Sequence, residues 1–392
     1  MKINNKSIKE ILGRNVEQVI TEKELEKKLA SGKQLRIKHG VDVTSPLLHI
    51  GHAVDYWKMR EFQELGHKIV FLIGDFTTKI GDPTGKSKTR PELDSETIAR
   101  NSEKYLEQIK KILKTEPNLF EIRRNSEWYN KMTLDDFLSL LKRVTHSQLI
   151  ERDMFQRRIK ENQEIFEHEL MYPILQGYDS VALESDMTII GSDQLFNEMM
   201  GRHFQKIFGQ DPQVVITTTI TPGLGGEEKM SKSLNNYVAI LDTPQDKFGK
   251  IMTLPDFLIN VYLPIYTKLS MPEIKEIKKL KPFEAKKRLA FEIVKLYDGE
   301  KKAQEAQDNF EKTFSKKEIP ENLKIYKAKK GETWIEFLTR NKFVSSKSEA
   351  KRLIDGGGVD FSGKKIQKAS EIVKKDGIAK IGKHQFVKIV VE

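Results

Sequence analysis

Short apolar runs alternate with longer amphipathic segments through the first half of the chain. The short runs have strand character and predict β-strands at residues 35–43, 69–73, 119–123, 187–190 and 214–219. Apolar residues at helical spacing predict helices over residues 1–34, 50–65 and 94–114, and from residue 194 onward. Strands alternating with helices of this length predict an α/β fold: a Rossmann-like parallel sheet with helices on both faces. Ligands of such sheets bind beyond the carboxyl ends of the strands.

The pattern then changes in ways that divide the chain into expected domains. Residues from about 125 to 170 are polar and helical, and we interpret them as an insertion in a first domain that spans residues 1–243. Lysine-rich helices without strand signals follow over residues 244–315. A charged linker is expected at residues 316–331. Residues 332–392 combine helical and strand patterns of their own and predict a small α/β domain.

Composition narrows the class of protein. The chain has 392 residues, of which 38% are hydrophobic and 32% are charged, as expected of a globular protein with two or three domains. It has no cysteine, which excludes disulfides, thiolate metal ligands and a thiol nucleophile. No apolar run approaches the roughly 20 residues of a membrane helix, and residues 1–5 lack the apolar stretch of a secretory signal. We therefore expect a cytoplasmic protein without membrane association.

Positive charge is concentrated near the C-terminus. The whole chain carries +11, and residues 321–392 contain 17 Lys and Arg against 9 Asp and Glu, a net charge of +8. The first 320 residues carry the remaining +3. A basic segment attached to a nearly neutral body favours a polyanionic partner, although an ordinary lysine-rich surface would give the same count.

Two histidines, His49 and His52, stand at the predicted start of the helix over residues 50–65. Their spacing places both on one face of the helix, and the free N–H groups of a helix N-terminus attract phosphate. Gly51 between them would let a nucleotide approach the backbone. A zinc pair or two surface histidines would have the same spacing, but further ligands at zinc-site spacing do not follow. We interpret the segment as one half of an ATP site.

The second half is expected at residues 229–233, Lys-Met-Ser-Lys-Ser, which follow a stretch rich in glycine. Glycines give such a loop mobility. Lys229 and Lys232 beside a triphosphate would stabilise the charge that builds up on departing pyrophosphate. An exposed basic turn is the alternative interpretation. The two segments, in this order and separated by most of a sheet domain, favour a shared nucleotide site.

Two further polar segments would complete a pocket. Residues 81–87 look like a phosphate-binding P-loop, but their glycines are one residue too close for that motif, so we expect Asp82 to offer a carboxylate to a cationic group instead. At residues 172–179, Pro173 suits the first turn of a helix. Gln176 and Asp179 would then share a face with Tyr172 at its mouth. A phenol, an amide and a carboxylate suit a small zwitterion that bears a hydroxyl, whereas a water-exposed polar face is the alternative.

Together these motifs resemble those of bacterial tyrosyl-tRNA synthetases, which are class I aminoacyl-tRNA synthetases. The resemblance covers nearly the whole chain and runs through residues 40–44, 49–52, 80–83, 172–179, 191–194 and 229–233. Residues 348–354 and 357–359 resemble a small RNA-binding domain first known from a ribosomal small-subunit protein. The resemblance implies a Rossmann-like catalytic domain, a helical anticodon-binding domain and a small C-terminal α/β RNA-binding domain.

The resemblance also implies roles for individual residues. On the amino-acid side, Asp82, Tyr172 and Gln176 would hold the amino group of tyrosine. Asp179 would accept a hydrogen bond from its phenolic hydroxyl, and Gln194 would face both tyrosine and the adenylate. The implied catalytic residues are Thr44, His49, His52, Lys229 and Lys232. The implied ATP-binding residues are Asp42, Gly51, Gly191, Asp193, Met230, Ser231 and Ser233. The implied RNA-binding residues are Lys347, Lys351 and Arg352.

Two positions depart from the family pattern. Many relatives have a tyrosine that contacts the phenol two positions before the glycine aligned with Gly40, and this chain has Lys38 there. Phenol recognition is therefore expected to rest on Asp179 with a different second partner. Val43 replaces a frequent proline.

The implied reaction has two steps. The carboxylate of tyrosine attacks the α-phosphorus of ATP, which enters as its Mg²⁺ complex, and the tyrosyl group then passes to a terminal ribose hydroxyl of tRNA(Tyr). The nucleophile is already ionised, so catalysis is expected from positioning and charge stabilisation. The resemblance further implies a homodimer with the insertion at its interface. No structural metal and no editing domain are expected.

Two other functions remain open at this stage. One is another adenylate-forming enzyme of the same fold, such as a tryptophan-specific synthetase or a small-molecule adenylyltransferase; Asp179 and the basic tail argue against it. The other is a non-catalytic RNA-binding protein on an old scaffold. The presence of both histidines and both lysines argues against that.

Overall fold

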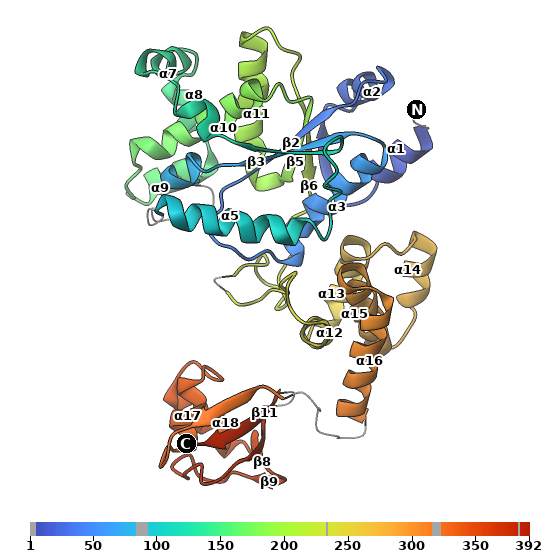
Figure 1. Cartoon of the computed structure of the whole chain (residues 1–392), viewed down its shortest axis with the longest axis vertical. Helices are drawn as coiled ribbons and strands as arrows, with labels where there is room; N and C mark the ends of the chain where they lie inside the picture. Colours follow the sequence, from blue (N-terminus) through green and yellow to red (C-terminus); the bar gives the residue numbers. More distant parts are fainter. Residues whose placement is uncertain (1–4, 84–92, 233, 316–322, 383–384) are drawn as a thin grey trace. The chain divides into compact units, whose positions relative to one another are not determined.

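The computed structural model describes residues 5–83, 93–232, 234–315, 323–382 and 385–392. They form two units, residues 1–306 and residues 307–392 (Figure 1). Among the described residues, no helix has the length and apolar character needed to cross a membrane.

A six-stranded sheet organises the first unit, with the strand order β1-β6-β5-β2-β3-β4. Neighbouring strands from β6 to β4 run parallel. The strands are β1 (Val16–Ile20), β2 (Arg36–Val41), β3 (Lys68–Ile73), β4 (Phe120–Arg124), β5 (Met187–Gly191) and β6 (Val214–Thr218). All five side chains of β6 are buried, as are five of the six in β3. Burial of this kind is typical of strands covered on both faces, and the parallel pairing confirms the predicted sheet.

Strand β1 was not expected, because the sequence predicted helix over residues 1–34. The structure has α1 (Asn5–Leu12), then β1, then α2 (Glu22–Ala30). β1 lies at the sheet edge and pairs antiparallel with β6. Its burial pattern does not alternate cleanly, so only the pairing with a distant strand defines it. The all-helical prediction for this segment is therefore wrong.

Helices cover both faces of the sheet (Figure 1). They are α3 (Ile50–Glu64) and α5 (Ser95–Ile109) on one face, and α10 (Glu167–Ala182) and α11 (Leu195–Ile207) on the other. Asp94, at the predicted start of this helix, is the N-cap of α5, and its side chain accepts a hydrogen bond from the backbone N–H of Thr97. α5 ends at Ile109, however, several residues before its predicted end. α10 and α11 approach closely at Gly177, where an added Cβ would lie 2.8 Å from Cγ of Met200.

The predicted insertion connects β4 to α10. It comprises α6 (Ser126–Tyr129), α7 (Leu134–Leu141), α8 (His146–Ile150) and α9 (Asp153–Lys160). An apolar cluster, which includes Leu140 and Phe155, packs these helices against α10 and α11. Pro173 lies inside α10 and not in its first turn, so the predicted helix start at this residue is wrong. The proline lacks an N–H, so it cannot make the helical hydrogen bond to the carbonyl four residues earlier.

Helices without intervening strands follow the sheet, as predicted, although α13 contains no lysine. They are α12 (Pro244–Met252), α13 (Asp256–Tyr266), α14 (Met271–Ile277), α15 (Pro282–Asp298) and α16 (Glu300–Ser315). Arg14, between α1 and β1, joins the N-terminal segment to α13. Its guanidinium donates to the carbonyls of Pro264 at 2.6 Å and Leu269 at 2.8 Å. Trp57 of α3 donates to the hydroxyl of Tyr297 at 3.2 Å, which links the sheet domain to α15.

The second unit contains a five-stranded sheet with the order β7-β11-β10-β8-β9. Its elements are β7 (Ile325–Ala328), α17 (Trp334–Arg340), α18 (Lys347–Asp355), β8 (Val359–Phe361), β9 (Lys364–Lys365), β10 (Gly377–Ile381) and β11 (Gln385–Val391). Trp334, Phe337 and Ile389 are buried in its core. β7 falls within residues 316–331, for which the sequence predicted a linker, and it pairs in parallel with β11. Residues 325–328 are therefore part of this sheet, whereas residues 316–322 lie outside the described residues.

Candidate active site

The carboxyl ends of β2, β5 and β6 meet at one pocket of about 650 Å³. Parallel strands end at the same edge of a sheet, so the segments that follow them converge there. The pocket brings together the described residues that the sequence assigned to tyrosine, ATP and catalysis. They are Asp42, Thr44, His49, Gly51, His52, Asp82, Tyr172, Gln176, Asp179, Gly191, Asp193, Gln194, Lys229, Met230, Ser231 and Lys232. Ser233, also assigned to ATP, lies outside the described residues.

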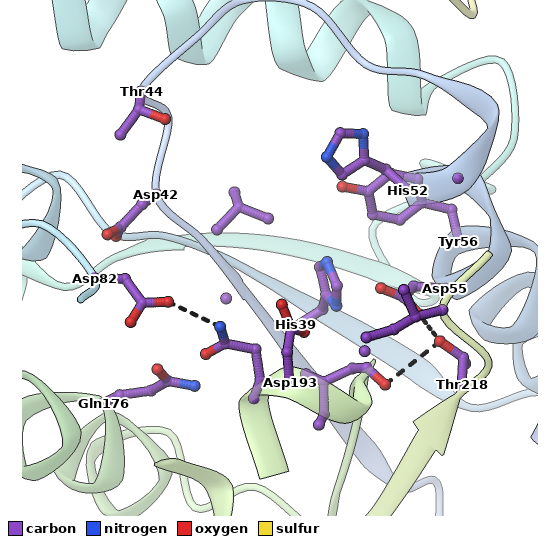
Figure 2. Close-up of a pocket in the computed structure, with 18 of the residues that line it drawn as sticks. His39, Asp42, Thr44, His52, Asp55, Tyr56, Asp82, Gln176, Asp193 and Thr218 are labelled. Carbon is purple, nitrogen blue, oxygen red and sulfur yellow. Dashed lines mark hydrogen bonds between the residues drawn. The ribbon is translucent and has the colours of Figure 1, made fainter. Parts of the chain in front are cut away.

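The labelled side chains fall into two groups along the pocket (Figure 2). Asp42, Asp82 and Gln176 lie toward one end, and His52 and Asp55 lie toward the other. The first end contains Asp82 and Gln176, which were expected to bind tyrosine, together with Asp42, which was assigned to ATP. The second lies beside the N-terminus of α3, where the sequence predicted the phosphates of ATP.

The two histidines stack on each other at the start of α3. His49 is the N-cap residue, and its backbone N–H donates to Nδ1 of His52 at 3.3 Å. The ring centroids are 3.6 Å apart with an interplanar angle of 29°. Both rings line the pocket, which confirms the shared face inferred from their spacing.

Burial keeps both imidazoles neutral. Burial, reinforced by the charge of Lys232, lowers the pKa of His49 to about 3. Burial also lowers the pKa of His52 well below its usual value, with His49, Lys232 and Lys229 adding to the effect. A neutral imidazole can donate a hydrogen bond to a phosphate oxygen without first carrying a charge.

The segment that follows the lysine loop (residues 229–232) contacts the start of α3 through its backbone. His49 forms a β-bridge with Ala239, and the N–H of Ile50 donates to the carbonyl of Val238 at 3.0 Å. An added Cβ on Gly51 would lie 3.4 Å from the sulfur of Met230. The two distant sequence segments are therefore neighbours in the folded chain.

Asn236 holds the lysine loop in place. Its Oδ1 accepts from the backbone N–H of Ser231 at 2.8 Å, and its Nδ2 donates to the carbonyl of Lys229 at 3.2 Å. Nζ of Lys229 lies 3.7 Å from Oδ2 of Asp193. This long ion pair is largely exposed, so it leaves the ammonium available to a more highly charged ligand.

At the other end of the pocket, carboxylates and amides converge. The hydroxyl of Tyr172 donates to Oδ2 of Asp42 at 2.9 Å. Nε2 of Gln194 donates to Oδ2 of Asp82 at 2.8 Å, as the dashed line to Asp82 shows in Figure 2. Gln176 accepts from Nδ2 of Asn197 at 2.8 Å. Two carboxylates beside a phenol and two amides can bind an ammonium group.

Asp179 is buried at the base of this end. Its Oδ1 accepts from Nε1 of Trp128 at 3.0 Å, and its Oδ2 lies 3.5 Å from Nδ2 of Asn125. Burial raises the pKa of Asp179 to about 7, although the charge of Lys38 and hydrogen bonds from Tyr129, Trp128 and Asn125 oppose the increase. A carboxylate with this pKa can accept a hydrogen bond from a ligand hydroxyl at neutral pH.

Lys38 lines the same base from β2 and is only 1% exposed. Its Nζ lies 2.7 Å from Oγ of Ser180 and 2.8 Å from Oε2 of Glu198. Glu198 is equally buried and also accepts from Nε2 of Gln176 at 2.9 Å. A buried lysine is thus part of the pocket at the position where the sequence departs from the family pattern.

Known proteins match this chain along its length. A family model described as class I tRNA synthetases (W and Y) matches residues 29–315, and an S4 domain model matches residues 336–377. The tyrosine–tRNA ligase of Thermotoga maritima is 42% identical over 97% of this chain and 96% of its own length. That of Oleidesulfovibrio alaskensis is 43% identical over 99% of each chain. The chain belongs to the tyrosine–tRNA ligase family.

A solved structure agrees with this assignment. The C-terminally truncated mitochondrial tyrosyl-tRNA synthetase of Coccidioides posadasii superimposes with a TM-score of 0.61 at 25% identity. The alignment covers 76% of this chain and 90% of that structure. The α/β class predicted from the sequence is thereby confirmed as the fold of this tyrosine–tRNA ligase family member.

Several residues that line the pocket of this family member, or bond to its lining, were not predicted from the sequence. Asn197 and Glu198 follow Gln194 at positions three and four along the chain, a helical spacing that could have revealed a shared face. Trp128 and Asn125 lie at the start of the insertion, far from any motif, and nothing in the local pattern marks them. Asp55, one turn after His52, accepts from the hydroxyl of Thr218.

The residues assigned to RNA lie in the second unit. Lys347, Lys351 and Arg352 are all exposed on α18, within the range matched by the S4 domain model. The side chain of Arg352 also lines a shallow pocket with Phe343 and Gln385. Exposed basic side chains on one short helix provide positive charge for a polyanion.

Proposed function

We propose that this chain activates L-tyrosine with ATP and transfers the tyrosyl group to tRNA(Tyr). One observation carries the proposal: a single pocket contains the histidine pair, the lysine loop and a base formed by Asp179. An enzyme that forms an adenylate from a hydroxylated zwitterion and a triphosphate, with release of pyrophosphate, needs these three groups together. Membership in the tyrosine–tRNA ligase family supports the same conclusion.

Tyrosine would lie with its phenol at the base of the pocket. Its ammonium would meet Asp82, Tyr172 and Gln176, with Gln194 beside them. Asp179 would accept the hydrogen bond of the phenolic hydroxyl. Phenylalanine would leave this buried carboxylate without a ligand partner, and an unsatisfied buried charge costs several times the net value of an ordinary hydrogen bond. Selection against phenylalanine would therefore occur at binding, without an editing domain.

ATP would lie across the start of α3. The carboxylate of tyrosine attacks the α-phosphorus, the bond to the bridging oxygen breaks, and pyrophosphate leaves with that electron pair. His49 and His52 would donate hydrogen bonds to phosphate oxygens, while Thr44 and Asp42 position the reacting groups. Lys229 would stabilise the negative charge that moves onto pyrophosphate.

The remaining nucleotide contacts would be shared between two loops. Gly51 and Gly191 let the nucleotide approach the backbone, and Asp193 would accept from ribose hydroxyls. Met230 and Ser231 would close over the phosphates together with Lys232. Because the nucleophile is already ionised, no general base is required, and catalysis would come from positioning.

Mg²⁺ would enter with the triphosphate. Among the described residues, no group of three or more histidine, aspartate or glutamate side chains is arranged to hold a metal ion. The phosphate oxygens of ATP are hard ligands that Mg²⁺ prefers. We assign the ion to the substrate complex, because it would enter bound to these oxygens.

Transfer to tRNA would use the rest of the chain. The helices over residues 244–315 would contact the anticodon arm, and α18 would contact the RNA backbone through Lys347, Lys351 and Arg352. Exposed apolar side chains on the insertion, including Leu134 at 73% and Phe166 at 46%, support a homodimer interface there. Synthesis of aminoacyl-tRNA for translation would place the protein in the cytoplasm.

Amino-acid-dependent exchange of pyrophosphate into ATP tests the proposal. We expect exchange with tyrosine and only weak exchange with tryptophan or phenylalanine. Exchange with tryptophan alone would identify a tryptophan-specific enzyme. No exchange with any amino acid would leave a non-catalytic RNA-binding protein as the better interpretation. Charging of bulk tRNA with labelled tyrosine then tests the second step.

A further inference from the structure

Lys38 is an unusual side chain for the base of an amino-acid pocket. It lies on β2, is 1% exposed, and lines the same cavity as Asp179. Burying a lysine costs several kcal/mol unless its charge is paired. The pairing partner is Glu198, whose carboxylate lies 2.8 Å from Nζ.

Glu198 contacts three groups of the protein. Its Oε1 accepts from Gln176 at 2.9 Å, and its Oε2 accepts from Nε2 of Gln213 at 2.8 Å as well as from Lys38. The carboxylate therefore neutralises the ammonium. Glu198 thereby holds the ammonium of Lys38 in place.

The ammonium of Lys38 retains one donor. An ammonium has three N–H groups, and within the described part of the chain Nζ is bonded to Ser180 and Glu198 only. The charge of Lys38 is also the leading influence that lowers the pKa of Asp179 against burial. The ammonium thus acts on the carboxylate that faces the same cavity.

A buried phenol needs two partners. Its O–H donates one hydrogen bond, and its oxygen accepts another through its lone pairs. Asp179 satisfies the first requirement. The N–H groups of Trp128 and Asn125 point to Asp179 itself, so they do not satisfy the second.

We propose that Lys38 donates its remaining N–H to the phenolic oxygen of tyrosine, and that Lys38 and Asp179 together determine specificity for the hydroxyl. This inference rests on the proposed function, since it names the second partner of the same substrate. It gives the phenolic oxygen a hydrogen-bond donor from β2, in addition to the acceptor that Asp179 provides for the phenolic O–H.

A purely structural role is the alternative. Lys38 joins β2 to Ser180 on α10 and Glu198 on α11, so its loss could simply loosen the base of the pocket. Such loosening would weaken the binding of tyrosine and of phenylalanine alike. Loss of a direct contact would weaken the use of tyrosine selectively. The ratio of kcat/KM for tyrosine to kcat/KM for phenylalanine therefore separates the alternatives.

The test compares kcat/KM for tyrosine and phenylalanine in pyrophosphate exchange. The variant Lys38→Met leaves Glu198 unpaired, so Lys38→Met/Glu198→Gln is made beside it to keep the buried charge balanced. We expect the preference for tyrosine to fall about 10- to 100-fold in both, as for a lost hydrogen bond to a charged group. An unchanged preference in the folded double variant would overturn the inference.

Lys58 offers a matched control. It is also a buried lysine, 2% exposed, and its Nζ lies 2.7 Å from Oε2 of Glu61, but neither residue lines the pocket. Lys58→Met/Glu61→Gln should lower stability and leave the ratio of tyrosine to phenylalanine unchanged. A similar fall in that ratio would show that the selectivity change reports stability only, and would overturn the inference.

A substrate analogue tests the contact without any variant. The amino group of 4-aminophenylalanine can donate to Asp179, but its delocalised lone pair is a poor acceptor for Lys38. The unmodified protein should use it at least about 10-fold less efficiently than tyrosine. Equal efficiency would overturn the role of Lys38 while leaving tyrosine activation intact, whereas no exchange with tyrosine itself would overturn the proposed function.

Discussion

At the residue scale, burial decides which side chains of the pocket carry charge. His49 and His52 are neutral because burial lowers both pKa values. Asp179 is held near the midpoint of its titration because burial raises its pKa to about 7. The phosphate end therefore contributes hydrogen bonds from neutral rings, with charge supplied by the lysine loop. At the tyrosine end, the protonation state of Asp179 changes near physiological pH.

The raised pKa of Asp179 predicts a pH dependence for tyrosine. A carboxyl group with a raised pKa is largely protonated below about pH 7 and loses its acceptor capacity there. We therefore expect kcat/KM for tyrosine to increase between about pH 6 and pH 8 and then level off, because this parameter reports the free enzyme. Both histidines titrate below this range, so they do not contribute.

Asp179→Asn provides the comparison. Its activity with tyrosine should be low and nearly independent of pH over the same range. Pyrophosphate-exchange rates at subsaturating tyrosine, recorded across this pH range, measure the pH dependence of kcat/KM for both proteins. The same rise with pH in the asparagine variant would assign the titration to another group.

Lys232 is expected to act on the transition state alone. Lys232→Ala should slow tyrosyl-adenylate formation by about 10²- to 10³-fold, the usual cost of removing one preorganised charge-stabilising group. Equilibrium binding of tyrosine should be nearly unchanged, because the loop lies at the phosphate end. Rapid-quench kinetics and equilibrium dialysis measure the two quantities.

Lys279→Ala is a suitable control. Lys279 follows α14 at the surface and pairs with Glu276, and both side chains are about 70% exposed. Removing it should change neither quantity. A large loss of tyrosine binding in Lys232→Ala would contradict the assignment of the loop.

At the element scale, the features that could be predicted from the sequence are those that depend on local patterns. The strands that line the pocket, the start of α3 at His49 and the cap at Asp94 could be read directly. β1 could not, because its pairing with β6 is a tertiary contact. The same reason applies to Trp128, which reaches Asp179 only after the insertion has packed. Pro173 was misassigned because tertiary packing tolerates a proline inside α10.

Packing of α10 against α11 positions Gln176 and Asp179. Gly177 allows the two helices to approach closely. A Cβ at Gly177 would lie 2.8 Å from Cγ and 3.0 Å from the backbone carbon of Met200. Gly177→Ala should therefore lower the free energy of unfolding by about 1–3 kcal/mol, the range for overpacking a core. Urea denaturation measures the change, and KM for tyrosine should increase as the helices separate.

Gly249 on α12 is the matched comparison. An added Cβ there meets no atom within 4 Å, so Gly249→Ala should stabilise the helix by about 0.5–1 kcal/mol. Equal effects of the two substitutions would show that the contact with α11 does not determine the cost.

At the scale of the whole molecule, the first unit is expected to form the adenylate and the second unit is expected to bind tRNA. Unit one contains the complete pocket, and the basic charge is concentrated in unit two. A deletion that tests this division must remove β7, which belongs to the second sheet. The appropriate truncation therefore ends at Ser315.

The truncated chain should exchange pyrophosphate with tyrosine at close to the full rate and charge tRNA poorly. In the full chain, Lys347→Ala/Lys351→Ala/Arg352→Ala should raise KM for tRNA by about 10-fold or more and reduce its dependence on salt, because fewer phosphate charges are neutralised. Aminoacylation measured across a range of salt concentrations tests both. Full charging by the truncated chain at physiological salt would assign the basic unit to another partner.

The central claim is that two distant segments act on one nucleotide. A crystal structure with tyrosine and a non-hydrolysable ATP analogue tests it most directly. The account predicts that the triphosphate lies between His52 and Lys232, with the phenol at Asp179. A triphosphate bound away from either segment would contradict it.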